Sequence, residues 1–170
     1  MDMRGITTEQ TLKEKPMQQD LEKVKLLARD LRDGKEFPRS PRDLLAGYVL
    51  AARAVDKCRA VLVGWGGEYH SNCPVDQLWL KFTEIDYDAF RSFLATGATD
   101  DEIAAWIGEH AKKRSRRDII AWNNKQRDLR LSDLSPEIQE YMEDYVQKFV
   151  PRNRVVYHWF DVYDLEEERI

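Results

Sequence analysis

The chain has 170 residues, of which 42% are hydrophobic and 34% are charged, and its formal net charge is -4. A chain of this length suits one domain that buries roughly two-thirds of its unfolded surface, so folding requires neither a disulfide nor a metal. The small net charge gives no general attraction for nucleic acid or for a membrane, and we expect neither as a partner. With no long apolar run and no secretory leader, the sequence predicts a cytoplasmic protein.

The first helix is expected only after a polar stretch. Residues 1–16 are polar and aperiodic and end at Pro16, which is typical of a disordered or frayed N-terminus. One helical domain is expected over residues 17–165. From Met17 to Arg32, apolar residues recur every three or four positions, which predicts a surface helix that ends before Gly34.

The longest predicted helix begins at Ser40. Ser40 suits the N-cap, Pro41 suits the first helical position, and an acid follows in the first turn. The residues from 44 to 52 are mostly apolar around the whole helix, which indicates burial on several sides. Beyond them the residues become charged, so we expect that half to leave the core, with Arg53 and Asp56 paired three positions apart.

A glycine-rich loop and a polar cluster follow this helix. Gly64, Gly66 and Gly67 each disfavour helix by about 1 kcal/mol, so they predict a tight loop. The cluster GEYHSNC then leads into Pro74, which suits the first position of another helix. This stretch holds the residues that helical periodicity does not require.

The remaining helices are predicted by their start signals. These signals lie at Asp86, at Thr99 with Glu102, at Ser115 with Asp118, and at Ser135 with Pro136. Residues 154–163 fit both a strand and a helix; because no other strand is predicted, we interpret them as a helical or irregular aromatic tail that covers the core. Residues 166–168 are expected to be solvated. The predicted fold is therefore all-α, a single-domain compact bundle of about seven helices with an aromatic C-terminal tail packed on it.

The central stretch resembles the signature of an uncharacterised bacterial family that is filed as a domain of unknown function. The matching motifs are PRSP from Pro38, GYV from Gly47, AR..DK.RA from Ala52, and GEYH.NCP.D from Gly67. They cover about a quarter of the chain. The resemblance implies a shared small bacterial domain and carries no activity with it.

Cys73 is the first candidate for chemistry. At the N-cap before Pro74, its sulfur faces free backbone N–H groups and the positive end of the helix dipole, which favours a thiolate. A thiolate there can act as a nucleophile or a ligand, with His70 and Glu68 as acid/base candidates. The alternative is that Cys73 is a small residue at a helix start and that His70 is satisfied by backbone.

A metal site is a further alternative for the same cluster. Glu68, His70, Cys73 and Asp76 offer mixed oxygen, nitrogen and sulfur donors, with Cys58, His110 or His158 as a fifth. The sequence lacks the second Cys/His pair of a structural zinc site. We therefore assign no metal site and name no cofactor.

Charged and polar residues around the loop suggest a pocket for a small polar or anionic ligand. The candidate ligand-binding residues are Arg39, Arg53, Asp56, Lys57, Tyr69, Asn72 and Asp76. The alternative is a network of ion pairs that holds the loop to the central helix. The basic run from Lys112 to Arg117 has no interleaved aromatic residues and is interpreted as a solvated turn.

Two functions of different classes remain open on sequence alone. The first is a ligand-binding protein with a pocket around the PRSP and GEYHSNCP motifs, in which catalysis by Cys73 is undecided. The second is a non-enzymatic interaction or structural protein, for example a homodimer, whose signature loop serves only the fold. Burial distinguishes them: a pocket protein places His70 and Cys73 in a concave site, whereas an interaction protein exposes an apolar patch.

Overall fold

The computed structural model describes residues 16–170, and every regular element in that range is helical. The elements are α1 (Leu21–Leu27), α2 (Ala51–Leu62), α3 (Pro74–Thr83), α4 (Tyr87–Leu94), α5 (Asp100–His110), α6 (Arg116–Arg127), the short 3-10 helix η1 (Leu131–Asp133), α7 (Pro136–Phe149) and α8 (Trp159–Glu166). The predicted all-α bundle is confirmed, with eight α-helices in the described range against about seven expected. The expectation for residues 1–15 lies outside the described residues.

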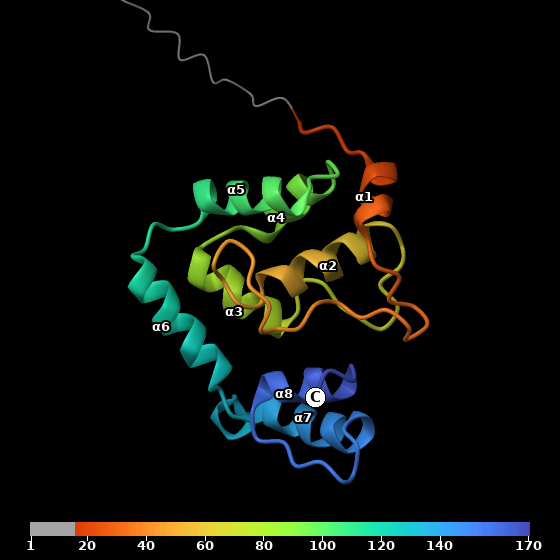
Figure 1. The fold of residues 1–170 in the computed structure, drawn as a ribbon, viewed down its shortest axis with the longest axis vertical. Helices are drawn as coiled ribbons and strands as arrows, with labels where there is room; N and C mark the ends of the chain where they lie inside the picture. Colours follow the sequence, from red (N-terminus) through yellow and green to blue (C-terminus); the bar gives the residue numbers. More distant parts are fainter. Residues whose placement is uncertain (1–15) are drawn as a thin grey trace, which may run out of the picture.

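The helices form three layers (Figure 1). The helices α4 and α5 lie above α2 and α3 in the view, and the α7–α8 pair lies below them. Helix α6 runs down one side from the upper layers to the lower pair. The middle helix α2 packs against α1, α3 and α4, so it is the centre of the arrangement.

The start of α2 differs from the sequence prediction. The helix begins at Ala51 and not after Ser40, because Leu50 has a left-handed backbone with φ 71. Residues 41–50 are turns whose backbone groups bond to other segments: the N–H of Leu50 donates to the carbonyl of Pro41 at 2.9 Å, and Asn123 of α6 accepts from Val49 and donates to Gly47. Tertiary hydrogen bonds thus replace the helical ones that the sequence signals favour.

The expectation that the charged half of α2 leaves the core is wrong. The side chains of Arg53, Asp56, Lys57 and Arg59 are all buried, with residue exposures of 3 to 4%. Arg53 and Asp56 do not pair with each other; Arg53 pairs with Glu167, and Asp56 pairs with arginines of the N-terminal segment. Buried charges persist where each one has a counter-ion and hydrogen bonds, and here every charged residue of this half has both.

The remaining boundaries follow the local signals closely. Asp86, Thr99 and Ser115 each accept a backbone hydrogen bond as N-caps of α4, α5 and α6, and Thr99 completes the predicted capping box with Glu102. Pro74 and Pro136 open α3 and α7 as predicted. The first helix is shorter than expected and spans only Leu21–Leu27.

The C-terminal tail packs on the bundle through its aromatic residues. Residues 155–158 lie outside the regular helices, and α8 begins at Trp159, which resolves the ambiguity over the tail. Trp159 and Phe160 are buried. The expected solvation of residues 166–168 is wrong for Glu167, which is 3% exposed, because its carboxylate accepts hydrogen bonds from Arg53 and Tyr69.

Candidate functional site

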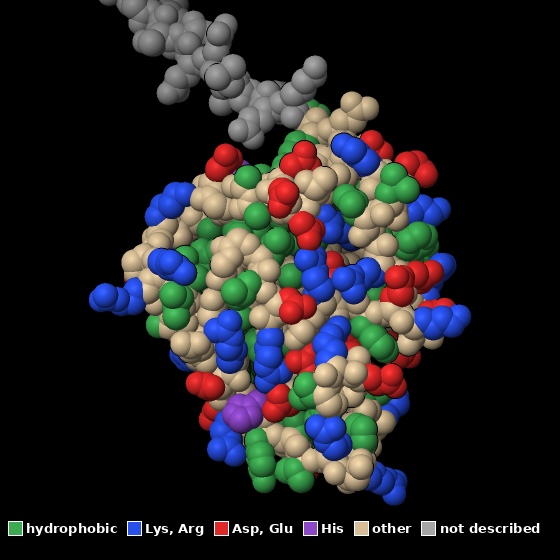
Figure 2. All heavy atoms as spheres, viewed as in Figure 1, with side chains coloured by type: hydrophobic (Ala, Val, Ile, Leu, Met, Phe, Trp, Pro, Cys, Tyr) green, Lys and Arg blue, Asp and Glu red, His purple; other side chains and the backbone are tan. Residues whose placement is uncertain are grey.

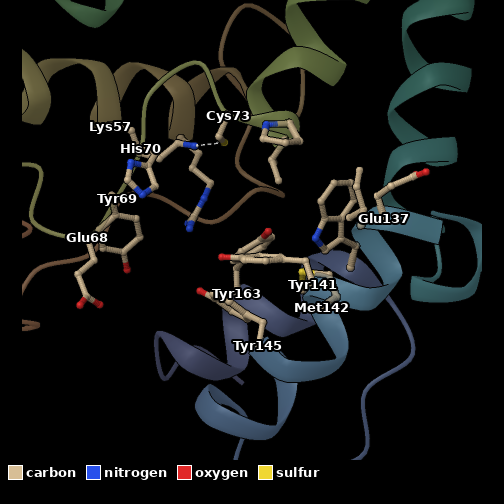
Figure 3. A pocket seen from close by; sticks show the side chains of 15 residues that line it. Lys57, Glu68, Tyr69, His70, Cys73, Glu137, Tyr141, Met142, Tyr145 and Tyr163 are labelled. Carbon is tan, nitrogen blue, oxygen red and sulfur yellow. Dashed lines mark hydrogen bonds between the residues drawn. The ribbon is translucent and has the colours of Figure 1, made fainter. Parts of the chain in front are cut away.

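A cavity of about 430 Å³ lies between the polar loop and the α7–α8 pair. The loop before α3 supplies Tyr69, His70 and Cys73 to one wall, and α2 supplies Arg53 and Lys57. Figure 3 shows Lys57, Tyr69, His70 and Cys73 facing the side chains of α7 and α8 across the cavity. The opposite wall is mostly apolar or aromatic, with one carboxylate, and consists of Glu137, Ile138, Tyr141, Met142, Tyr145, Trp159 and Tyr163.

The glycine-rich loop positions this wall by packing closely on the N-terminal segment. Gly67 has φ +56, and a Cβ there would lie 2.7 Å from the carbonyl oxygen of Leu31. Only glycine combines that backbone conformation with such a close approach. The N–H of Leu31 also donates to the carbonyl of Trp65 at 2.9 Å. These contacts hold the start of the GEYH segment beside the cavity.

Cys73 and Lys57 meet at the polar end of the cavity. Lys57 Nζ donates to Cys73 Sγ at 3.1 Å, and it lies 2.7 Å from Asp76 Oδ1 (Figure 3 marks the first contact). The side chains of Lys57 and Asp76 are 4% and 3% exposed, so water screens their attraction weakly. Asp76 also accepts from the N–H of Asn72 at 3.0 Å, which fixes the carboxylate. A partly exposed thiol therefore lies against a buried, oriented ammonium group.

The neighbouring wall contains a second buried ion pair. Arg53 makes two hydrogen bonds to Glu167, at 2.9 and 2.7 Å, and the Glu167 side chain is fully buried. Tyr69 donates its hydroxyl proton to the same carboxylate at 2.9 Å. Burial, and then the negative charge of Glu167, raise the pKa of Tyr69, so its hydroxyl stays protonated. The Arg53 guanidinium also lies 4.9 Å from the ring centre of Tyr163, within cation–π range.

Tyr145 on the far wall is held by a third carboxylate. Its hydroxyl donates to Glu166 Oε2 at 2.5 Å. Burial raises the pKa of Glu166, and burial together with the neighbouring carboxylate raises the pKa of Tyr145. The hydroxyls of Tyr69 and Tyr145 thus have carboxylate partners, whereas the buried indole nitrogen of Trp159 has no hydrogen-bond partner. The aromatic faces of the cavity suit contact with an apolar body.

Six of the ten predicted site residues line this cavity: Cys73, His70, Glu68, Arg53, Lys57 and Tyr69. Asp76 is not among the cavity residues but pairs with Lys57, and Asn72 lies in the wall of a second, adjoining cavity of about 950 Å³. His70 and Glu68 are both exposed. Among the described residues, no hydrogen bond joins His70 to Cys73; the contact of the sulfur is Lys57.

Arg39 and Asp56 belong to an ion-pair network away from the cavity. Arg39 donates to Asp56 through Nε, Nη2 and its backbone N–H, at 2.8 to 2.9 Å. Its Nη1 reaches Asp100 at 2.7 Å, and Arg59 reaches the other oxygen of Asp100 at 2.8 Å. The alternative that the sequence left open, a network that holds the chain to the central helix, describes these residues.

Two other candidate sites receive no support from the geometry. Within residues 16–170, no group of three or more His, Cys, Asp or Glu side chains comes together in a way that could hold a metal ion, so the mixed-donor metal alternative lacks a ligand set. In the basic run, Lys112 pairs with Glu84, and Arg114 donates to the carbonyl of Phe82 at 2.9 Å. These lysine and arginine side chains are engaged with the protein itself.

Sequence reasoning missed the wall formed by α7 and α8. Tyr141, Tyr145 and Tyr163 recur with the spacing of residues on the inner face of a helix. That spacing predicts core residues and gives no sign of a cavity wall. Nothing in that pattern distinguishes Tyr141, which is 64% exposed and borders the cavity. Exposure of this kind depends on how the helices pack, so the spacing alone does not reveal it.

Comparison with known proteins adds a family but no relative of assigned activity. Within the described residues, no helix has the length and apolar character needed to span a membrane. A search of curated proteins found no match to the chain. A family model described as "Domain of unknown function (DUF5069)" matches residues 35–169, which include the polar loop, α2 and the α7–α8 pair. The chain therefore belongs to this family of domains of unknown function.

Proposed function

We propose that the protein binds a small molecule with an apolar, ring-containing body and an uncharged polar group, in the cavity between the GEYHSNC loop and α7–α8. The observation that carries this proposal is the cavity itself. Its volume of about 430 Å³ lies in the range of small-molecule sites, which span roughly 300–1,000 Å³. Such sites combine mostly apolar walls with a few convergent polar groups, and this cavity has Lys57, Cys73 and His70 at one end.

The ion pairs around the cavity favour an uncharged ligand over an anion. Arg53 is paired with Glu167, and Lys57 is paired with Asp76. An anion that competes for either cation leaves a buried carboxylate without its partner, which costs several kcal/mol. A hydroxyl, carbonyl or amide can instead accept or donate a hydrogen bond at this end without separating either pair.

Catalysis is a narrower proposal within the same site. Cys73 is the candidate nucleophile because its sulfur borders the cavity and contacts an ammonium group. Lys57 supports this role better than His70 or Glu68, since it is the group that contacts the sulfur. His70 and Glu68 stay candidates for acid/base chemistry, because both border the cavity and can approach a bound ligand.

The alternative, an interaction or structural protein, explains some of the family motifs. Arg39, Asp56 and Arg53 are fully engaged in ion pairs, so these motif residues serve the fold. The cavity is not explained in this way, because His70 and Cys73 border a concave site. On the face shown in Figure 2, hydrophobic side chains lie in small groups among charged ones. Both observations favour the ligand-binding proposal.

A matched pair of tyrosine variants tests the proposal. Tyr141 lines the cavity and is 64% exposed, whereas Tyr157 is 58% exposed and is not among the cavity residues. The probes are planar aromatic fragments with one hydroxyl, amide or carbonyl group, observed by saturation-transfer NMR. We expect some of them to bind the wild-type protein, to bind Tyr141→Ala at least about twofold more weakly, and to bind Tyr157→Ala unchanged, because one partly exposed ring contact contributes about 0.5–1.5 kcal/mol.

Two results of that experiment contradict the proposal. One is the absence of binding by any fragment of this class to the wild-type protein at millimolar concentration. The other is equal weakening by both substitutions, which indicates general adhesion to exposed tyrosines and not occupation of the cavity. Chemical shifts of residues 68–75 and 138–145 provide the location of any bound fragment independently of affinity.

A further inference from the structure

The contact between Lys57 and Cys73 has a chemical consequence beyond ligand binding. Lys57 Nζ and Cys73 Sγ are 3.1 Å apart, and no side chain lies between them (Figure 3). The lysine side chain is 4% exposed and is held by Asp76 at 2.7 Å, while Cys73 is only partly buried and borders the cavity. A small oxidant that enters the cavity thus reaches a sulfur that already touches a fixed amine nitrogen.

We propose that Cys73 and Lys57 form a peroxide-reactive modification site, in which a hydroperoxide oxidises the sulfur and the two side chains then join through a reversible sulfur–nitrogen bond. The oxidant is a hydroperoxide, ROOH, with hydrogen peroxide as the simplest member. This proposal does not depend on the identity of a bound ligand. It requires only the thiol, the amine and access through the cavity.

In the first step, the Cys73 thiolate attacks one peroxide oxygen. A bond forms between the sulfur and the hydrogen-bearing oxygen of ROOH, the oxygen–oxygen bond breaks, and the Lys57 ammonium gives one proton to the leaving RO oxygen, which departs as ROH. The products are Cys73 sulfenic acid, ROH and a neutral Lys57 amine; sulfur has lost two electrons and the peroxide has gained them. The ammonium beside the sulfur therefore supplies the proton that this step needs.

In the second step, the neutral Nζ of Lys57 attacks the sulfenic sulfur. A sulfur–nitrogen bond forms, the sulfur–oxygen bond breaks, and the hydroxyl departs with an amine proton as water. No further oxidant is consumed. Sulfenic acids condense with thiols and with backbone nitrogen, and the Lys57 amine would take the place of that nitrogen here. A thiol reverses the link by attacking the sulfur and releasing Lys57 as an amine, so the modification is reducible.

Cys58 requires attention in the experiment because it follows Lys57 in the sequence. A disulfide between Cys58 and Cys73 and a bond between Lys57 and Cys73 join the same two peptides with the same loss of two hydrogens. The full chain is therefore studied as the Cys58→Ala variant, in which Cys73 is the single thiol. It is treated with hydrogen peroxide, digested without reductant and examined by tandem mass spectrometry.

We expect a linked pair of peptides, two hydrogens lighter than their sum, with fragments that place the bond between residues 57 and 73. Dithiothreitol should return both peptides to their original masses. In the Cys58→Ala, Lys57→Arg control, which keeps the positive charge, we expect no such link and a sulfenic or sulfinic acid at Cys73 instead. If Cys73 of the Cys58→Ala protein is oxidised to sulfinic acid while the Lys57 peptide stays unmodified, or if Cys73 resists peroxide, the proposal is wrong. The fragment assignment stands even if the Lys57→Arg control does not fold.

Discussion

The Glu167 side chain shows how a single residue near the end of the chain can hold several distant segments together. Its carboxylate is fully buried and accepts from Arg53, Tyr69 and Arg169. These donors come from α2, from the polar loop and from the last residues of the chain. Glu167 therefore joins three segments at the back of the cavity wall. Its burial was not foreseen, because a run of glutamates looks solvated when the partners are unknown.

Glu167→Gln should destabilise the protein strongly. The substitution keeps the shape but removes the charge that compensates the buried Arg53, and breaking such a pair on one side costs about 3–5 kcal/mol. The free energy of unfolding from urea denaturation measures the loss. The control is Arg53→Met with Glu167→Leu, which removes both charges and should recover a substantial share of it. A loss below about 1 kcal/mol for the single variant contradicts the assigned role.

The capped helices are the elements that local sequence predicts best. Thr99 with Glu102, Ser115 and Asp86 act within three residues of the groups they bond, so their sequence signals contain the whole interaction. The start of α2 shows the opposite case. Ser40 and Pro41 have the right types for a helix start, yet Asn123 bonds the backbone around residue 48 from 74 positions away. Nothing local to Ser40 indicates that contact.

The N-terminus of α5 allows a matched test of the ion-pair network. Asp100 accepts from Arg39 and Arg59, whereas Asp101, in the same first turn, is exposed. Both carboxylates interact favourably, and to a similar extent, with the positive end of the helix dipole. Since Asp100 is itself 40% exposed, Asp100→Asn should cost about 1–2 kcal/mol of unfolding free energy, and Asp101→Asn less than about 0.5 kcal/mol. Equal costs contradict the network.

The difference in unfolding free energy between the wild-type protein and Asp100→Asn should depend on pH in a definite direction. Burial of Asp100 opposes ionisation, but the hydrogen bonds and charges of Arg39 and Arg59 outweigh it and lower the pKa of Asp100 below its ordinary value of 3.8. A carboxyl whose pKa is lower in the folded state contributes its full stability above the unfolded pKa. The gap between the wild-type protein and Asp100→Asn should therefore be constant above about pH 5 and shrink as the pH falls through the lowered pKa.

At the scale of the whole molecule, buried ion pairs join α2 to the other layers and leave a cavity beside it. Arg39 lies 17 residues before its partner Asp56, and Arg53 lies 114 residues before Glu167. The sequence predicted the fold class, most helix starts and one wall of the candidate site, because those depend on local patterns. It did not predict the buried charges or the α7–α8 wall, because both depend on contacts between distant segments.

The reactivity of Cys73 provides the most direct test that the cavity is a binding site. Burial raises the pKa of the Cys58 thiol to about 11, despite weaker opposing hydrogen bonds, so Cys58 should be unreactive in the folded protein at neutral pH. Cys73 borders the cavity and should react. Two maleimides, one with a phenyl and one with an ethyl group, then compare an aromatic with a small aliphatic body at the same sulfur.

The measurement is the ratio of the N-phenylmaleimide rate to the N-ethylmaleimide rate at Cys73, divided by the same ratio for free glutathione. If the cavity binds an aromatic body beside the thiol, the corrected ratio should be about ten, since tenfold corresponds to about 1.4 kcal/mol of added binding, and it should fall in Tyr141→Ala. A corrected ratio of about one in the wild-type protein, with Cys73 reacting like an open thiol, contradicts the proposal that this cavity is a ligand site.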